Sequence, residues 1–239
     1  MEIAPGVHSL GQRRGGRVHA FLLDDGHDLT VIDTLFDTDG ARILSAISRL
    51  GHTPRDLKQI VLTHGHRSHL GGLAALKRLT GATVSAHGWE ADIIAGERKA
   101  QPVTRVLTRP VRTWWPTYLF QLGVNLGFGK HPACPIDRAI TDGDAIGPLQ
   151  VIHAPGHSPG HLAFYWPERR ALFAGDAIVT WPTVAPGWPA FNLNPTQHRA
   201  SLNRLAGLDV SVIGVGHGEP IVQGAAEQLQ TLARAAAGS

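Results

Sequence analysis

Apolar residues along this chain form two kinds of pattern: short runs bounded by turn residues, and stripes at helical spacing. The short runs predict strands, and the stripes predict amphipathic helices. The predicted strands cover residues 18–23, 29–32, 59–62, 82–86, 149–153, 162–166, 171–174 and 210–215. The predicted helices run from the turn at 37–40 to residue 50, and over 70–79, 195–205 and 224–237. Strands followed by helices, in two successive rounds, predict an α/β fold with two packed sheets and helices outside.

Residues 95–135 depart from this pattern, because prolines and glycines interrupt any long element there. We therefore predict a single domain over residues 1–239, in which residues 95–135 are an insertion that acts as a lid or lines the substrate pocket. Three arginines of this stretch are expected to be solvated surface groups: Arg105, Arg109 and Arg112. Its aromatic residues are Trp114, Trp115, Tyr118, Phe120 and Phe128.

Composition limits the partners and the compartment. Hydrophobic residues make up 43% and charged residues 17% of the 239 residues, as in a globular protein with a large core. A net charge of +3 is too small to indicate nucleic-acid binding. Cys134 is the only cysteine, so an internal disulfide is excluded and a reducing compartment is favoured. The N-terminus lacks a signal-peptide pattern and no apolar run has the length of a membrane span, so we predict a cytoplasmic protein.

Candidate chemistry begins directly after the predicted strand at residues 59–62, in the segment that contains His64, His66 and His69. His64 and His66 are two positions apart, so in an extended backbone their side chains point the same way. Neutral imidazole is the commonest protein ligand for metals. The pair therefore predicts a metal site at the end of this strand. His69, near the start of the next helix, is placed to serve a second cation.

Further ligand-type residues follow later strands. His157, Asp176 and His217 each come after an apolar run and lie beside glycines. Such strand ends converge on one edge of a sheet, where sites of α/β proteins commonly lie. Three imidazoles on one cation, with an open position for water, are typical of a catalytic zinc site. Asp176 would bridge to a second cation held by His69 and His217.

These motifs identify the chain as similar to the metallo-β-lactamase superfamily, near the glyoxalase II-like hydrolases. The family's His-x-His-x-Asp-His signature resembles the segment with His64, His66 and His69, and its later Pro-Gly-His, Gly-Asp and Gly-His elements resemble those that end in the other three ligands. The resemblance implies an αββα sandwich of two mixed sheets flanked by helices, with one or two Zn²⁺ ions between them, or iron or manganese instead. It implies a first metal bound by His64, His66 and His157. It implies a second metal bound by His69, His217 and bridging Asp176.

One position departs from the family, since Ser68 stands where the signature has aspartate. A serine hydroxyl is a poor ligand for zinc, iron or manganese, so the second site is expected to bind metal more weakly. Three states therefore remain open: two metals with a water in the gap, one metal, or an inactive descendant.

The resemblance implies hydrolysis, in which metal-bound hydroxide attacks the carbonyl carbon of a small ester, lactone, thioester or related substrate. Asp176 would position this nucleophile and collect its proton. Aromatic residues in the insertion, together with Trp181, Trp188 and Phe191, would form a partly apolar pocket; alternatively, they pack the insertion or form a homodimer contact.

The absence of an export signal disfavours an antibiotic-hydrolysing β-lactamase, and the absence of a basic patch disfavours a nuclease. The alternative from another class is a non-catalytic metal- or ligand-binding protein on the same scaffold. Four other histidines are expected to be structural or surface groups: His87, His153, His161 and His198. Among them, His161 is the one expected to support a metal ligand.

Overall fold

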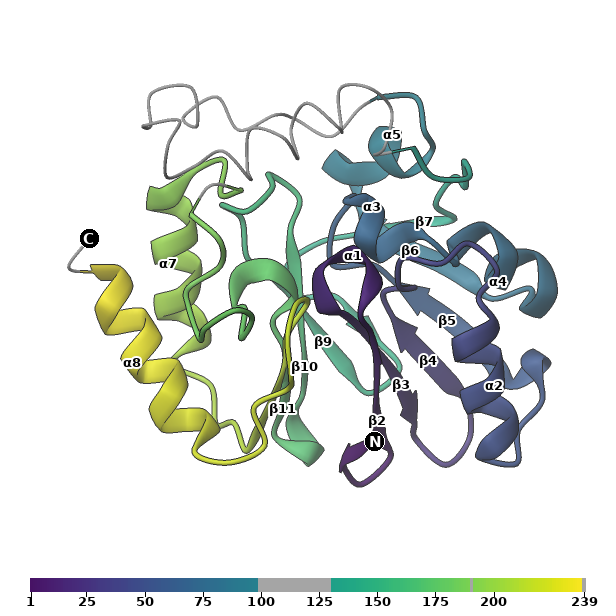
Figure 1. Ribbon diagram of the computed structural model, residues 1–239, viewed down its shortest axis with the longest axis horizontal. Coiled ribbons are helices and arrows are strands. Elements are labelled where there is room, and N and C mark those ends of the chain that lie inside the picture. Colours follow the sequence, from purple (N-terminus) through teal and green to yellow (C-terminus); the bar gives the residue numbers. More distant parts are fainter. Residues whose placement is uncertain (99–129, 190, 238–239) are drawn as a thin grey trace.

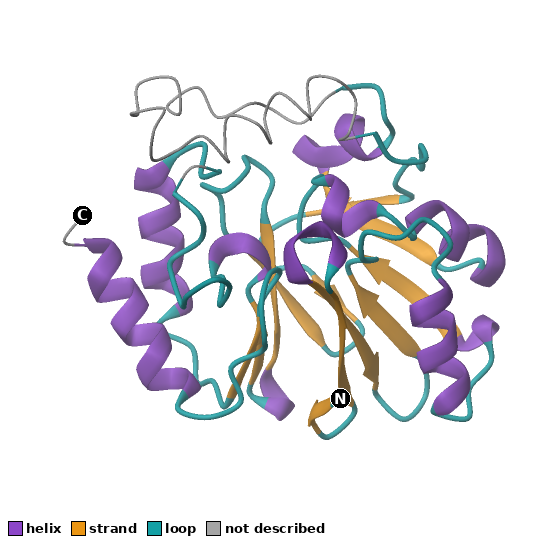
Figure 2. Cartoon of the chain, viewed as in Figure 1, coloured by secondary structure: helices purple, strands orange, loops and turns teal. Residues whose placement is uncertain are grey.

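The computed structural model describes residues 1–98, 130–189 and 191–237, and it consists of two β-sheets packed face to face between two layers of helices (Figure 1 and Figure 2). This αββα arrangement confirms the predicted fold class. The first sheet has seven strands in the order of the chain: β1 (Glu2–Ala4), β2 (Val7–Gln12), β3 (Val18–Asp24), β4 (Leu29–Ile32), β5 (Leu57–Val61), β6 (Thr83–His87) and β7 (Arg138–Ile140).

Both sheets are mixed. In the first sheet β1 to β4 pair antiparallel and β4 to β7 pair parallel. The second sheet has the order β12-β11-β10-β9-β8, and only its β11–β12 pair is parallel. Its strands are β8 (Ala145–Ile146), β9 (Leu149–His153), β10 (Leu162–Trp166), β11 (Ala171–Phe173) and β12 (Val212–Gly214).

Helices cover the outer face of each sheet, with α2 and α4 on the first and α7 and α8 on the second (Figure 1). The α-helices are α1 (Arg14–Arg17), α2 (Ala41–Arg49), α3 (Arg67–Leu70), α4 (Leu73–Thr80), α5 (Ala91–Ile94), α7 (Pro195–Leu205) and α8 (Ala225–Ala237). Short 3₁₀ turns complete the described part of the chain: η1 (Pro54–Asp56), η2 (Gly88–Glu90), η5 (Pro167–Arg169) and η6 (Gly175–Ala177). None of the described helices combines the length and apolar character that a membrane span requires. The cytoplasmic location stays a prediction.

The apolar runs become strands because both of their faces are buried. Phe21 of β3 and Phe173 of β11 meet between the sheets with ring centroids 5.1 Å apart. Separate apolar clusters lie beneath the helices, so the molecule has a core between the sheets and one core under each helical layer. Sheets buried on both faces read as nearly continuous hydrophobic segments, which is why the sequence pattern identified them.

The structure divides the helix predicted over residues 70–79. Residues Gly71 and Gly72 separate α3 from α4, and a side chain at Gly71 would collide with the Phe36 carbonyl. The break lets α3 pack tightly against the loop after β4. The residues 99–129 of the predicted insertion, including its aromatic residues and its three arginines, lie outside the described residues, so the insertion and the extent of the domain stay predictions.

Candidate metal centre

Six ligand-type side chains come together at one end of the two sheets. Each follows a strand or lies in the short helix or turn after it: His64 and His66 after β5, His69 in α3, His157 after β9, Asp176 in η6 and His217 after β12. Their donor atoms form two groups that share Asp176, and within each group all atoms lie within 4.8 Å of one another. The structure thus brings together all six residues singled out in the sequence.

The first group consists of three imidazoles and Asp176. His66 Nδ1 lies 2.9 Å from His64 Nε2 and 3.0 Å from His157 Nε2. Three nitrogen lone pairs that face one another repel unless a cation or protons lie between them. Zn–N bonds of about 2.0–2.1 Å in tetrahedral geometry put neighbouring nitrogens about 3.3 Å apart, close to the spacing observed. The group therefore fits a cation bound by three histidines.

The second group consists of His69, His217 and Asp176. Asp176 Oδ1 lies 3.3 Å from His69 Nε2, and Oδ2 lies 3.4 Å from His217 Nε2. The same Oδ2 is also 3.4 Å from His157 Nε2, in the first group. A carboxylate between two sets of imidazoles has the position of a bridging ligand.

Hydrogen bonds turn two of the rings toward the centre. Asp33 Oδ2 accepts hydrogen bonds from His69 Nδ1 at 2.8 Å and from the Thr63 hydroxyl at 2.8 Å. Because that hydroxyl donates to Asp33, its oxygen accepts from His64 Nδ1 at 3.0 Å. Both rings therefore keep Nε2 for the centre, which is how outer partners commonly orient metal-binding histidines.

The other two rings that use Nε2 are held from different loops. His157 Nδ1 lies 3.3 Å from Asn192 Oδ1, and His217 Nδ1 donates to the Gly16 carbonyl at 2.8 Å. A Cβ atom at Gly16 would lie 3.2 Å from that imidazole nitrogen, so the glycine lets the backbone approach the ring. The roles of Asn192 and Gly16 carry no signal in the sequence, because they depend on contacts between distant segments.

Two buried polar atoms test whether these residues fit a metal. His69 Nε2 and Asp176 Oδ1 lie 3.3 Å apart, within ion-pair distance, but among the described residues neither atom makes a well-aligned hydrogen bond. Buried polar atoms are nearly always paired, so such orphans require an explanation. A cation bound by both atoms would satisfy them, and the donor set of nitrogen and carboxylate oxygen suits zinc, iron or manganese.

Burial keeps the first three imidazoles neutral. It lowers the pKa of His66 and lowers the pKa values of His64 and His157 well below the usual histidine range. A neutral imidazole has a free lone pair on one nitrogen, whereas an imidazolium has none. The first group is therefore ready to bind a cation at neutral pH without losing a proton.

The second group has the opposite electrostatics at one residue. Burial disfavours the charge on His69, but the carboxylates of Asp33 and Asp176 outweigh it and raise the pKa of this ring to about 10. Burial likewise opposes the charge on Asp176, yet the imidazoles of His217 and His69 hold its pKa well below the usual range. Without a metal, His69 carries part of the positive charge that a cation would supply.

Ser68 lies half-buried in α3, between Arg67 and His69. No other carboxylate or histidine of the described residues joins the second group. The chain therefore offers no substitute for the family aspartate in this part of the structure. Weaker metal binding at the second site stays a prediction.

His161 and His198 are buried supports. His161 Nε2 accepts from the Asp176 backbone N–H at 3.1 Å, and its Nδ1 donates to the Ala154 carbonyl at 3.1 Å. This ring joins the loop that carries His157 to the turn that carries Asp176. His198 lies 3.0 Å from the Ala177 carbonyl and serves the same turn from α7.

His87 and His153 lie outside both groups and stack on each other, with centroids 4.6 Å apart and an angle of 11° between the rings. Aromatic residues border the second group instead. The Trp188 ring lies 4.5 Å from the His217 ring, 5.9 Å from Trp181 and 5.7 Å from Phe191, measured between centroids. These three residues form an aromatic cluster beside the candidate metal ligands.

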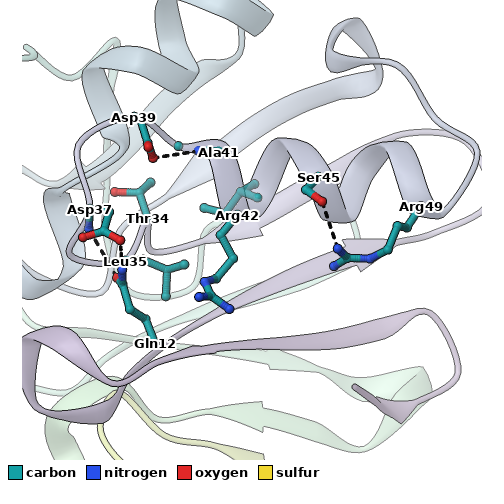
Figure 3. A pocket seen from close by; sticks show the side chains of 11 residues that line it. Gln12, Thr34, Leu35, Asp37, Asp39, Ala41, Arg42, Ser45 and Arg49 are labelled. Carbon is teal, nitrogen blue, oxygen red and sulfur yellow. Dashed lines mark hydrogen bonds between the residues drawn. The ribbon is translucent and has the colours of Figure 1, made fainter.

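A pocket of about 380 Å³ lies elsewhere, between α2 and the ends of β2 and β4 (Figure 3). None of the six ligand-type residues lines it, and some of its polar groups pair locally: Asp39 accepts from the Ala41 N–H at 3.0 Å and Arg49 donates to Ser45 at 2.9 Å. This pocket therefore lies apart from the candidate metal ligands.

Sequence relatives include several hydrolases. The chain is 27% identical to the uncharacterized protein YobT of Bacillus subtilis over 84% of its length and 83% of the relative's. It is 27% identical to the probable metallo-hydrolase YflN of the same organism, over 92% and 86% of the two chains. It is also 27% identical to a hydroxyacylglutathione hydrolase of Rhodobacter capsulatus over 76% of its own length, but it spans only 56% of that enzyme.

Solved structures and a family model agree with these relatives. A metallo-beta-lactamase family protein of Thermus thermophilus, TTHA1429, superposes with a TM-score of 0.65 and 26% identity over 98% of this chain and 79% of the other. TTHA1623 in a di-iron-bound form gives a TM-score of 0.67 and 26% identity over 90% and 94%. A model of the metallo-beta-lactamase superfamily matches residues 13–217. The chain therefore belongs to the metallo-beta-lactamase superfamily.

Proposed function

We propose that this protein is a metal-dependent hydrolase that attacks the carbonyl carbon of a small, partly apolar ester, lactone or thioester. The observation that carries the proposal is the convergence of five imidazoles on one buried carboxylate, Asp176, with two buried atoms that make no well-aligned hydrogen bond among the described residues. A structural zinc site is closed by four protein ligands, whereas the second group offers only three, which leaves a coordination position open.

The chain's own residues divide the work between them. His64, His66 and His157 would hold the first cation, and His69 and His217 the second, with Asp176 between them. Such a cation supplies Lewis acidity and a lowered pKa for a bound water. Zn²⁺ suits the ligands, and the di-iron form of a structural neighbour supports iron as an alternative.

Asp176 is the candidate catalytic residue. Its low pKa keeps it ionised at neutral pH, so it can accept a hydrogen bond from an attacking water and orient it. The same low pKa makes it a weak proton acceptor, so orienting the water would be its main role. Its backbone N–H is held by His161, which fixes where the carboxylate points. The missing family carboxylate at Ser68 leaves this role to Asp176 alone among the described residues.

The substrate class follows from the surroundings. The aromatic cluster of Trp181, Trp188 and Phe191 would contact an apolar acyl chain or ring beside the second group. The hydroxyacylglutathione hydrolase among the relatives adds thioesters to the classes worth testing.

Hydrolysis by reconstituted protein tests the proposal. Metal-free protein would be loaded with Zn²⁺, Fe²⁺ or Mn²⁺ and assayed against p-nitrophenyl esters, lactones and an S-hydroxyacyl glutathione thioester. We expect turnover of at least one class, abolished by His157→Ala and retained by His27→Ala, a change of an exposed histidine in the β3–β4 turn. Metal binding without turnover of any class would favour the non-catalytic scaffold, for which the serine at position 68 is the supporting observation.

A further inference from the structure

Glu90 is a buried acid outside both groups of candidate ligands. It closes η2 after β6 and is only 1% exposed. Among the described residues no lysine or arginine forms an ion pair with it. Burying a carboxylate costs free energy unless hydrogen bonds replace those it made to water. The three hydrogen bonds that Glu90 accepts therefore indicate its role.

Those three hydrogen bonds come from two loops. Oε2 accepts from the Gly65 N–H at 3.1 Å, and Oε1 accepts from the Ser158 hydroxyl at 2.7 Å and the Gly160 N–H at 2.8 Å. Gly65 lies between His64 and His66, and Ser158 follows His157. One carboxylate therefore joins the two loops that carry the three imidazoles of the first group.

The glycines of both loops make room for this carboxylate. A Cβ atom at Gly65 would lie 3.0 Å from Glu90 Oε2 and 2.9 Å from Ile93 Cγ2, and one at Gly160 would lie 2.9 Å from Oε1. Neither glycine has the positive φ that would require glycine for backbone reasons. Gly160 excludes a side chain chiefly because Glu90 is there, and Gly65 excludes one because of Glu90 and Ile93 together.

We propose that Glu90 is a positioning residue for the first metal site. By joining the two loops, it sets how His157 faces His66, whose nitrogens lie 3.0 Å apart. Its negative charge also lies next to a group that would hold a cation. This inference rests on the proposed metal centre and adds a determinant of the affinity and geometry of the first site.

Glu90→Gln is the direct test, because the amide has the shape of the carboxylate but only one acceptor oxygen. Whichever way the amide turns, one backbone N–H faces an NH₂ group, so the link to the Gly65 loop is lost or the link to the other loop is reduced to the Ser158 hydroxyl. Metal-free full-length protein would be titrated with Co²⁺ against a competing chelator, and the visible absorption of bound Co²⁺ recorded. We expect the first equivalent to bind about 10- to 100-fold more weakly than in the wild type, with an altered spectrum.

Tyr165→Phe is the matched control for lost stability. Tyr165 lies on β10, outside both ligand loops, and its hydroxyl donates to the Asp209 carbonyl at 2.6 Å. The substitution removes this hydrogen bond. This variant is expected to lower the melting temperature of the metal-free protein while leaving Co²⁺ affinity and spectrum unchanged. A purely structural Glu90 would make Glu90→Gln behave in the same way, which would overturn the proposal.

Ser158→Ala is the test if Glu90→Gln does not fold. It removes only the hydroxyl that donates to Glu90 and leaves the carboxylate and its two backbone donors in place. We expect about 2- to 10-fold weaker binding of the first Co²⁺. Unchanged binding in this variant would contradict a positioning role. Wild-type protein that binds Co²⁺ but hydrolyses nothing would refute the hydrolase alone, whereas wild-type protein that binds no metal would refute both proposals.

Discussion

The two groups of candidate ligands differ in charge and in support, although they share Asp176. The first has three imidazoles, all with lowered pKa values, in loops joined by Glu90. The second has two imidazoles, one of them with its pKa raised to about 10. The first group offers four ligand-type residues with neutral imidazoles, while the second offers three and holds a proton on His69.

This difference predicts two sites of unequal affinity on one scaffold. Only His69 of the second group lies in α3, directly after Ser68. We therefore expect metals to bind in sequence, with the first group filled before the second.

The largest effect is expected from Asp176→Asn, which removes the charge common to both groups. Hydrolysis should fall about 10³-fold or more, because both the bridging ligand and the group that orients the water are lost. Activity and elemental analysis of the same preparation would show the loss of turnover together with the loss of metal. Full metal content with normal turnover would exclude Asp176 from both roles.

The pH dependence of metal affinity should separate the two groups. His69 is protonated below its pKa of about 10, so the second metal has to displace a proton and its affinity should fall about tenfold for each unit the pH drops. The first three imidazoles have lowered pKa values, so their affinity should stay nearly constant from pH 9 to pH 7. Chelator competition at several pH values would measure both slopes. Equal slopes would contradict the assignment.

Ser68→Asp should strengthen the second site about 10- to 100-fold by restoring a charged ligand, and leave the first unchanged. Metal per chain, measured by elemental analysis after dialysis against a weak chelator, should rise from near one to near two. Two equivalents already present in the wild-type protein would show that serine is tolerated. The exposed change Ser48→Asp on α2 is a suitable control.

The smallest effect is expected from Asp33→Asn, which weakens the orientation of a ligand without removing one. Loss of the carboxylate disturbs the His69 hydrogen bond at 2.8 Å, which weakens second-site binding, but it also lowers the pKa of His69 and so reduces the competition from its proton. We therefore expect a net weakening of the second site of less than about tenfold at neutral pH. Calorimetric titration of metal into the variant would report this change, with Asp28→Asn in the exposed β3–β4 turn as its control. Because Asp33 also accepts from Thr63, which orients His64, the first site should weaken less than the second; a change at the first site alone would contradict the link between Asp33 and His69.

Much of the fold could be predicted because its strands are apolar on both faces. The strands at 149–153 and 162–166 and the helix at 195–205, with Asn194 as N-cap, agree with the structure. β1 and β2 were not predicted, since β1 has only three residues and β2, although mostly buried, contains histidine, serine, glycine and glutamine. The predicted 70–79 helix is wrong at its start, where a close contact between Gly71 and Phe36 requires a break that helical spacing does not encode.

The candidate ligands could be predicted because each follows a strand in a recognisable motif. Their supports could not. Glu90 appears in the sequence as one acidic residue after a strand, and only its burial and its three donors from distant loops reveal its position. Asn192 and Gly16 were missed for the same reason: contacts at long sequence separation leave no local pattern.

The hydrogen bond between His217 and the Gly16 carbonyl joins residues 201 positions apart, and the His19 N–H donates to the Gly216 carbonyl close by at 2.9 Å. Bringing residues of such high sequence separation together costs loop-closure entropy, which must be met before the contacts stabilise the fold. The complete second site therefore exists only once the start and the end of the matched family region have met. Metal uptake at that site should therefore follow folding, so that metal would stabilise the folded chain and would not initiate its folding.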